Sequence, residues 1–71
     1  MQQLDLHGLT HSEATLAIED FVLIQNLPVK IITGNSLPMQ QIVKEIVKKH
    51  QLCWDYESHW NLGAIIVGEL R

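Results

Sequence analysis

The sequence predicts one α/β domain that covers residues 1–71, with a mixed four-stranded sheet and two helices in the order β-α-β-α-β-β. Three observations predict it. The chain has 71 residues, the size of a single small domain. Two long amphipathic stretches lie between short apolar runs. Apolar residues make up 46% of the chain and charged residues 18%, a composition typical of a packed protein and not of a disordered one.

The first expected strand alternates apolar and polar side chains, with Leu4 and Leu6 on one face and Asp5 and His7 on the other. This alternation is typical of a strand that is buried on one face. Gly8 then ends the strand.

The first helix is expected to begin at Thr10. Thr10 and Glu13 have the spacing of a capping box, in which each side chain satisfies a free backbone N–H. The helix is expected to end at Asn26-Leu27-Pro28, because proline and the residue before it disfavour helix. Its expected core residues recur at intervals of three and four: Ala14, Ala17, Ile18, Phe21 and Ile24.

The second strand is expected from Val29 to Thr33, where adjacent β-branched residues favour extended backbone, and it ends at Gly34. Asn35 or Ser36 can cap the helix that follows, with Pro38 in its first turn. The expected core face of that helix is Met39, Ile42, Val43, Ile46 and Val47.

The last part of the chain predicts two further strands. Alternating residues from Leu52 to Glu57 indicate the third strand, and Asn61-Leu62-Gly63 is a turn signal. The run from Ala64 to Val67 is continuously apolar, which is typical of a strand in the middle of a sheet.

The charge balance argues against a strongly basic nucleic-acid coat protein. Five Lys and Arg residues stand against eight Asp and Glu residues, so the net charge is −3. A polyanion would therefore have to be held by local groups. The second helix carries the only local basic surface, formed by Lys44, Lys48 and Lys49. Of these, Lys44 and Lys48 are the candidate phosphate contacts, and the alternative is a solvated helix face.

The sequence gives no reason to expect a metal or a cofactor. Cys53 is the single cysteine, and it forms no zinc-ligand pattern with the four scattered histidines. The start of the chain has no basic n-region, and no apolar run approaches the ~18 residues needed to cross a bilayer. A cytoplasmic protein without membrane contact is therefore expected.

The candidate binding site lies at one edge of the sheet. Parallel strands joined by a helix connect right-handedly, so the first two strands are expected to end at the same edge. That edge gathers two turns that lead into helix N-termini, where free N–H groups attract anions. The candidate phosphate-binding residues there are Gly8, His11, Thr33, Gly34, Asn35 and Ser36.

His7 is the leading candidate for catalysis, because histidine exchanges protons most readily near neutral pH. Asp5 lies two residues earlier on the same strand face, where its carboxylate could orient the imidazole for general acid–base cleavage of a phosphodiester. The alternative is a histidine at the end of a strand beside an aspartate that shapes the turn.

Four segments together resemble the Smr (small MutS-related) domain. They are LDLHG at 4–8, IITGNS at 31–36, IVKEIV at 42–47 and NLGAIIV at 61–67. The resemblance implies a two-layer α/β sandwich similar to the C-terminal domain of translation initiation factor three. It also implies action on nucleic acid, since Smr domains nick or cleave DNA or RNA and some only bind it. By position, Asp5 and His7 correspond to the aspartate and histidine of the family motif.

One family motif is only partly present. The familiar loop continues after its first glycine with a cation and a second glycine, whereas this chain has Asn35-Ser36 after Thr33-Gly34. We therefore expect a small stand-alone Smr-like domain that binds RNA or DNA and is a possible endonuclease. The alternative is an inactive module that binds nucleic acid, a ribosome or a protein partner. A chain this short is also a candidate homodimer.

Overall fold

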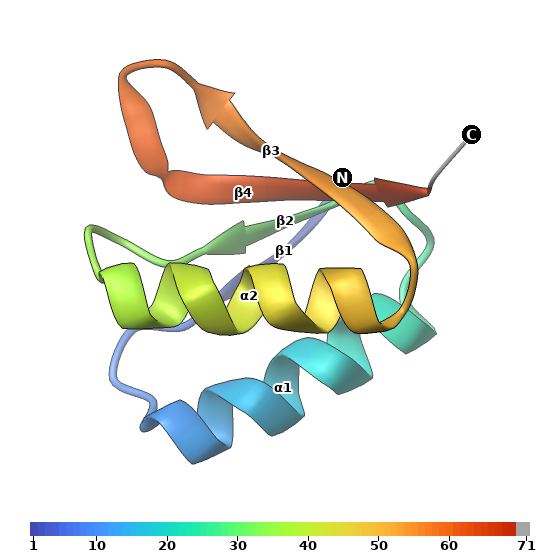
Figure 1. The fold of residues 1–71 in the computed structure, drawn as a ribbon, viewed down its shortest axis with the longest axis horizontal. Helices are drawn as coiled ribbons and strands as arrows, with labels where there is room; N and C mark the ends of the chain where they lie inside the picture. Colours follow the sequence, from blue (N-terminus) through green and yellow to red (C-terminus); the bar gives the residue numbers. More distant parts are fainter. Residues whose placement is uncertain (70–71) are drawn as a thin grey trace.

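The computed structural model describes residues 1–69 and confirms the predicted element order. The elements are β1 (Gln2–Asp5), α1 (His11–Ile24), β2 (Val29–Ile32), α2 (Leu37–Lys49), β3 (Leu52–Ser58) and β4 (Asn61–Glu69). Both helices lie on one side of the sheet, so the domain is a two-layer sandwich (Figure 1). Within residues 1–69 no helix has the length and apolar character needed to cross a membrane.

The sheet has the strand order β1-β2-β4-β3. β1 pairs parallel with β2, while β4 pairs antiparallel with both β2 and β3. The mixed sheet predicted from the sequence is therefore confirmed. Because β1 and β2 are parallel, their carboxyl ends lie at the same edge. β1 and β3 are the outer strands, and each has one side without a strand partner in the described sheet.

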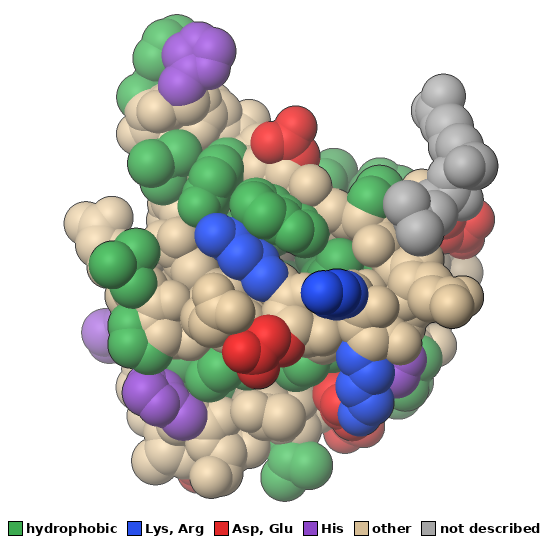
Figure 2. All heavy atoms as spheres, in the orientation of Figure 1, with side chains coloured by type: hydrophobic (Ala, Val, Ile, Leu, Met, Phe, Trp, Pro, Cys, Tyr) green, Lys and Arg blue, Asp and Glu red, His purple; other side chains and the backbone are tan. Residues whose placement is uncertain are grey.

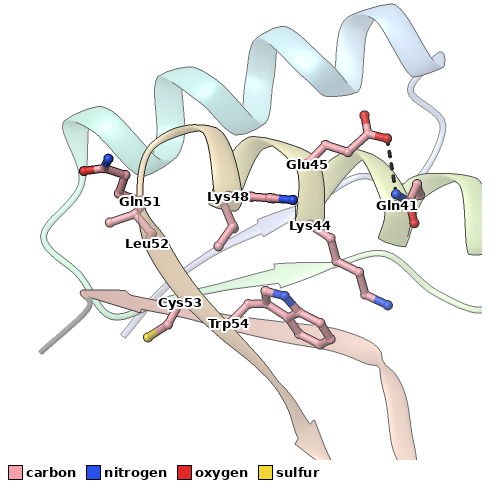
Figure 3. Close-up of a pocket in the computed structure, with 9 residues that line it drawn as sticks. Gln41, Lys44, Glu45, Lys48, Gln51, Leu52, Cys53 and Trp54 are labelled. Atoms are coloured by element: carbon pink, nitrogen blue, oxygen red, sulfur yellow. Dashed lines mark hydrogen bonds between the residues drawn. The ribbon is translucent and has the colours of Figure 1, made fainter.

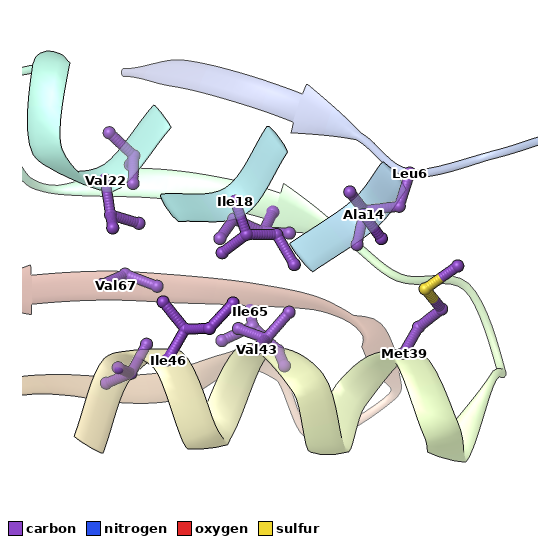
Figure 4. Close-up of a cluster of buried hydrophobic side chains, with 12 residues drawn as sticks. Leu6, Ala14, Ile18, Val22, Met39, Val43, Ile46, Ile65 and Val67 are labelled. Carbon is purple, nitrogen blue, oxygen red and sulfur yellow. The ribbon is translucent and has the colours of Figure 1, made fainter. Parts of the chain in front are cut away.

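The core lies between the sheet and the two helices. Side chains of α1 and α2 point toward β2 and β4, which supply every second residue to the core (Figure 4). The largest fully buried side chains are Ile18, Ile31, Ile65, Val29, Val43, Val47 and Val67. Burying one such side chain contributes about 1.5–3 kcal/mol, so these residues supply much of the driving force for folding.

The core face of α1 differs from the expectation at one end. Ile24 is 75% exposed, and Val22 is buried in its place at 4%. Ala14, Ile18 and Val22 follow one another at intervals of four, which sets the buried face. At 100° per residue, Ile24 lies about 120° around the helix from Ile18 and so points away from the sheet. The prediction that Ile24 is a core residue is therefore wrong.

Several strand boundaries also differ, and β2 ends at Ile32, one residue before the expected end at Thr33. β1 begins at Gln2 and ends at Asp5, because pairing with β2 starts at Gln2, and His7 lies in the turn that follows. The prediction of a turn at residues 61–63 is also wrong. His59 and Trp60 form the turn, and residues 61–63 belong to β4, where pairing with β3 already begins at Asn61.

Candidate functional site

Two turns that are distant in the sequence converge at the carboxyl ends of β1 and β2. They enclose a pocket of about 410 Å³, which we call the edge pocket. Its lining residues are Asp5, Leu6, His7, Gly8, Leu9, Ile32, Thr33, Gly34, Ser36 and Met39. The structure thus brings together most of the candidate residues that the sequence placed at this edge.

The first turn places His7 at the rim of the pocket. The backbone N–H of Leu6 donates to the carbonyl of Ile32 at 3.0 Å, which continues the β1–β2 pairing beyond the strand. The N–H of Leu9 donates back to the Leu6 carbonyl at 3.1 Å and closes the turn. Gly8 has a φ of +80°, in the left-handed region that favours glycine. These contacts leave the His7 side chain exposed.

Asp5 shapes this turn by holding backbone. Its Oδ1 accepts a hydrogen bond from the backbone N–H of His7 at 2.9 Å. A short carboxylate readily reaches the amide two residues further on, which is the Asx-turn geometry. Within the described chain, no hydrogen bond joins Asp5 to the imidazole of His7. This hydrogen bond is the contact expected if Asp5 shapes the turn. It is not the contact with the imidazole that would orient His7 for catalysis.

The second turn is held against β4. The N–H groups of Thr33 and Gly34 both donate to the carbonyl of Gly63, at 2.7 and 3.0 Å. The Thr33 hydroxyl lies 3.1 Å from the Gly34 carbonyl and 3.2 Å from the Gly63 carbonyl, so its proton is also used within the protein. These two candidate residues therefore position the turn. The backbone N–H groups of residues 35–37 make no hydrogen bond within the described chain and remain available to a ligand.

Gly63 allows this contact because it has no side chain. A Cβ built there would lie 3.1 Å from both the Cα and the carbonyl oxygen of Gly34. Gly34 itself has a φ of +63°. The sequence predicts a turn at Gly63, whereas this glycine lies in β4 and lets the second turn lie directly on the strand.

Gln40 is a buried polar residue that the sequence reasoning missed. It is 5% exposed and lies behind the second turn. Its Nε2 donates to the Leu62 carbonyl at 3.1 Å and lies 3.4 Å from the Gly34 carbonyl, while its Oε1 accepts from the Tyr56 hydroxyl at 3.3 Å. The sequence does indicate that Gln40 is on the buried face of α2, because it stands three residues before the core residue Val43.

The two helix N-termini at this edge differ in charge. At α1, Glu13 Oε1 accepts from the N–H of Thr10 at 2.9 Å, and the Thr10 hydroxyl accepts from the N–H of Glu13 at 3.2 Å. The backbone hydrogen bond to Thr10 lowers the pKa of Glu13, so this end already holds a carboxylate. At α2, Ser36 is the cap and the first turn has no acidic residue. The N-terminus of α2 is therefore the one open to an anion.

The remaining candidates lie elsewhere. His11 and Asn35 do not line the edge pocket, and Lys44 and Lys48 line a separate groove between α2 and β3. Within the part of the chain that the structure describes, no lysine or arginine lines the edge pocket. Among residues 1–69 no group of three or more His, Cys, Asp or Glu side chains is arranged to hold a metal ion.

Comparisons of the chain with protein-family models, with curated proteins and with solved structures gave no match. The fold and the edge pocket define a small two-layer α/β domain with a candidate anion site. The resemblance to Smr domains continues to depend on the motifs themselves.

Proposed function

We propose that this chain is a Smr-like nucleic-acid-binding domain that holds a backbone phosphate in the edge pocket. The observation that carries the proposal is the convergence of the His7 turn with the N-terminus of α2. Of residues 35–37 Ser36 lines the pocket, and its free backbone N–H and the positive end of the helix dipole suit a phosphate. The exposed imidazole of His7 lies at the rim of the same pocket, where a protonated ring would add a positive charge.

The geometry favours binding over cleavage. For cleavage, His7 would exchange a proton with a ribose hydroxyl, a water or a leaving oxygen. Among residues 1–69, no lysine or arginine lines the pocket to stabilise the charge that develops on the phosphate. The Asp5 carboxylate is engaged with backbone rather than with the ring. Cleavage is thus the secondary activity to be tested at this site.

A titration tests the proposal directly. Structured RNA or branched DNA is added to the ¹⁵N-labelled protein, and the backbone amide signals of residues 7–8 and 34–37 are followed. We expect these signals to shift, with binding weakened several-fold in His7→Ala. His11→Ala is the matched control, because His11 is exposed and does not line the pocket. It should bind like the wild type.

Two results would contradict the proposal in different ways. If the edge signals do not respond to any nucleic acid, the site is not a phosphate site, and the module that binds a protein or a ribosome becomes the better explanation. Cleavage is followed separately on labelled RNA and DNA, with and without chelator. Equal cleavage by the wild type and by His7→Ala would end the catalytic assignment and leave the binding proposal intact.

A further inference from the structure

A second hollow, larger than the edge pocket, lies between α2 and the outer strand β3. It is an open groove of about 1030 Å³, which we call the α2–β3 groove. Its lining residues are Gln41, Lys44, Glu45, Val47, Lys48, Gln51, Leu52, Cys53 and Trp54 (Figure 3). None of them takes part in the edge pocket. We infer that this groove binds a short, extended acidic segment of another protein, which adds to β3 as a fifth strand.

The groove is lined on one side by residues 52–54 of the outer strand β3. In the described sheet β3 pairs with β4 on one side only, so N–H and C=O groups on its other side have no strand partner. The N–H of Tyr56 donates to the Asp55 carboxylate at 2.8 Å, so a peptide would have to displace that contact to pair there. Leu52 and Cys53 are neighbours on the strand, so their side chains point to opposite faces of the sheet, yet both line the groove. Residues 52–56 pair regularly with β4, over a length of about 17 Å. This edge is suited to strand addition, in which main-chain hydrogen bonds hold an extended peptide.

The groove is lined by two lysines and one carboxylate, that of Glu45, and its excess of positive charge favours an acidic partner. Among residues 1–69 the lysines at 30 and 49 are each in an ion pair with a glutamate, at 2.6 and 2.7 Å. Lys44 and Lys48 are in none, and both line the groove. Lys44 Nζ lies 4.6 Å from the ring centre of Trp54, which holds its charge beside an apolar surface. Figure 2 shows lysine side chains next to a hydrophobic area on this face.

The spacing of the two lysines matches a strand. Four residues on a helix advance by about 6 Å, which is the separation of Lys44 and Lys48 along the axis of α2. Two residues on a strand advance by about 6.7 Å, and they point to the same side. A Glu-x-Glu sequence in an extended segment therefore has a similar interval between its carboxylates. Apolar residues beside it would face Val47 and Trp54 on the floor of the groove.

Other occupants fit less well. A second copy of this chain would pair β3 with β3 and bring the Asp55 carboxylates of the two copies onto one face, where like charges repel. A single-stranded nucleic acid would use the two lysines and stack on Trp54, but it would leave the strand edge unpaired. An extended acidic segment can form ion pairs with the two lysines and main-chain hydrogen bonds with the outer edge of β3.

The test uses the peptide Val-Thr-Glu-Thr-Glu-Thr-Val with the whole chain. We expect saturable binding, shifts of the amide signals of residues 52–56, and slower hydrogen exchange at the free edge of β3. The rearranged peptide Val-Thr-Glu-Glu-Thr-Thr-Val has the same composition and charge, but its carboxylates point to opposite sides. It should bind about fivefold more weakly or worse. Equal affinity of the two peptides, or no binding of the first, would overturn the inference.

Variants on α2 give a second measurement. The double change Lys44→Gln and Lys48→Gln should weaken binding of the first peptide about tenfold. Lys49→Gln is the matched control, because Lys49 lies on the same helix but pairs with Glu19 of α1. A result in which an oligothymidine strand shifts Trp54 more strongly than the peptide, and depends on the same lysines, would assign the groove to nucleic acid instead. His7→Ala should leave peptide binding unchanged, which separates this inference from the proposed function.

Discussion

Replacing Gly63 with alanine tests whether the second turn depends on its close contact with β4. The new Cβ would lie 3.1 Å from the Cα and the carbonyl oxygen of Gly34. Relief requires the turn to move by a few tenths of an ångström. The hydrogen bonds from Thr33 and Gly34 to the Gly63 carbonyl, at 2.7 and 3.0 Å, oppose that movement. We therefore expect Gly63→Ala to destabilise the domain.

Two opposing effects set the magnitude. Forcing an extra carbon into a packed position typically costs about 1–3 kcal/mol. Alanine also restricts the unfolded chain, which favours folding by about 0.4–1 kcal/mol where the backbone conformation is compatible. The net loss is about 1–2 kcal/mol in the free energy of unfolding. In a domain of this size the Tm should fall by roughly 4–16 °C.

Urea denaturation followed by circular dichroism and tryptophan fluorescence measures the loss. Gly68→Ala is the matched control on the same strand, because the nearest atom to its Cβ would be Cys53 Sγ at 3.8 Å, an ordinary contact. Its stability should be unchanged or higher. Amide signals of residues 33–36 should shift in Gly63→Ala and remain in place in the control. If both variants unfold at the wild-type urea midpoint, the explanation of how Gly63 positions the edge pocket is refuted.

Three further changes test other contacts. Gln40→Leu should lower the free energy of unfolding by about 1–3 kcal/mol, because it removes the side-chain donor to the Leu62 carbonyl; urea midpoints measure this. Thr10→Ala removes the cap of α1 and should cost about 1 kcal/mol, seen as a lower Tm in circular dichroism. Hydrogen bonds lower the pKa of Glu13, Glu19 and Glu57 below 4.5 in the folded state. The unfolded chain therefore binds more protons in acid, so the stability these groups contribute is present above about pH 4.5 and is lost as the pH falls through their folded pKa values. Urea midpoints should fall with acidification, and Glu19→Gln, which removes the partner of Lys49, should make the decline shallower.

The edge pocket shows how far sequence reasoning extended into the site. The meeting of the His7 turn with the turn after β2 followed from one topological rule, since parallel strands joined by a helix end at the same edge. The same rule does not predict which group the Asp5 carboxylate contacts. This carboxylate could reach a backbone amide or an imidazole, and the path of the turn decides which group lies 2.9 Å away.

The sequence by itself determined the order of the elements and where the helices begin. These features depend on residues that are close in the chain, such as the capping box of Thr10 with Glu13 and the cap at Ser36. Alternation and helical periodicity likewise need only a short window, so they predicted four strands and two helices correctly.

Only the tertiary structure decided which of these local features meet. It placed Val22 in the core instead of Ile24, laid Gly34 on Gly63, and left β3 as an outer strand beside α2. Each of these outcomes depends on contacts between residues that are distant in the sequence. Such contacts are set by how the two layers pack and by which side chains fill the space between them, and no local pattern contains that information.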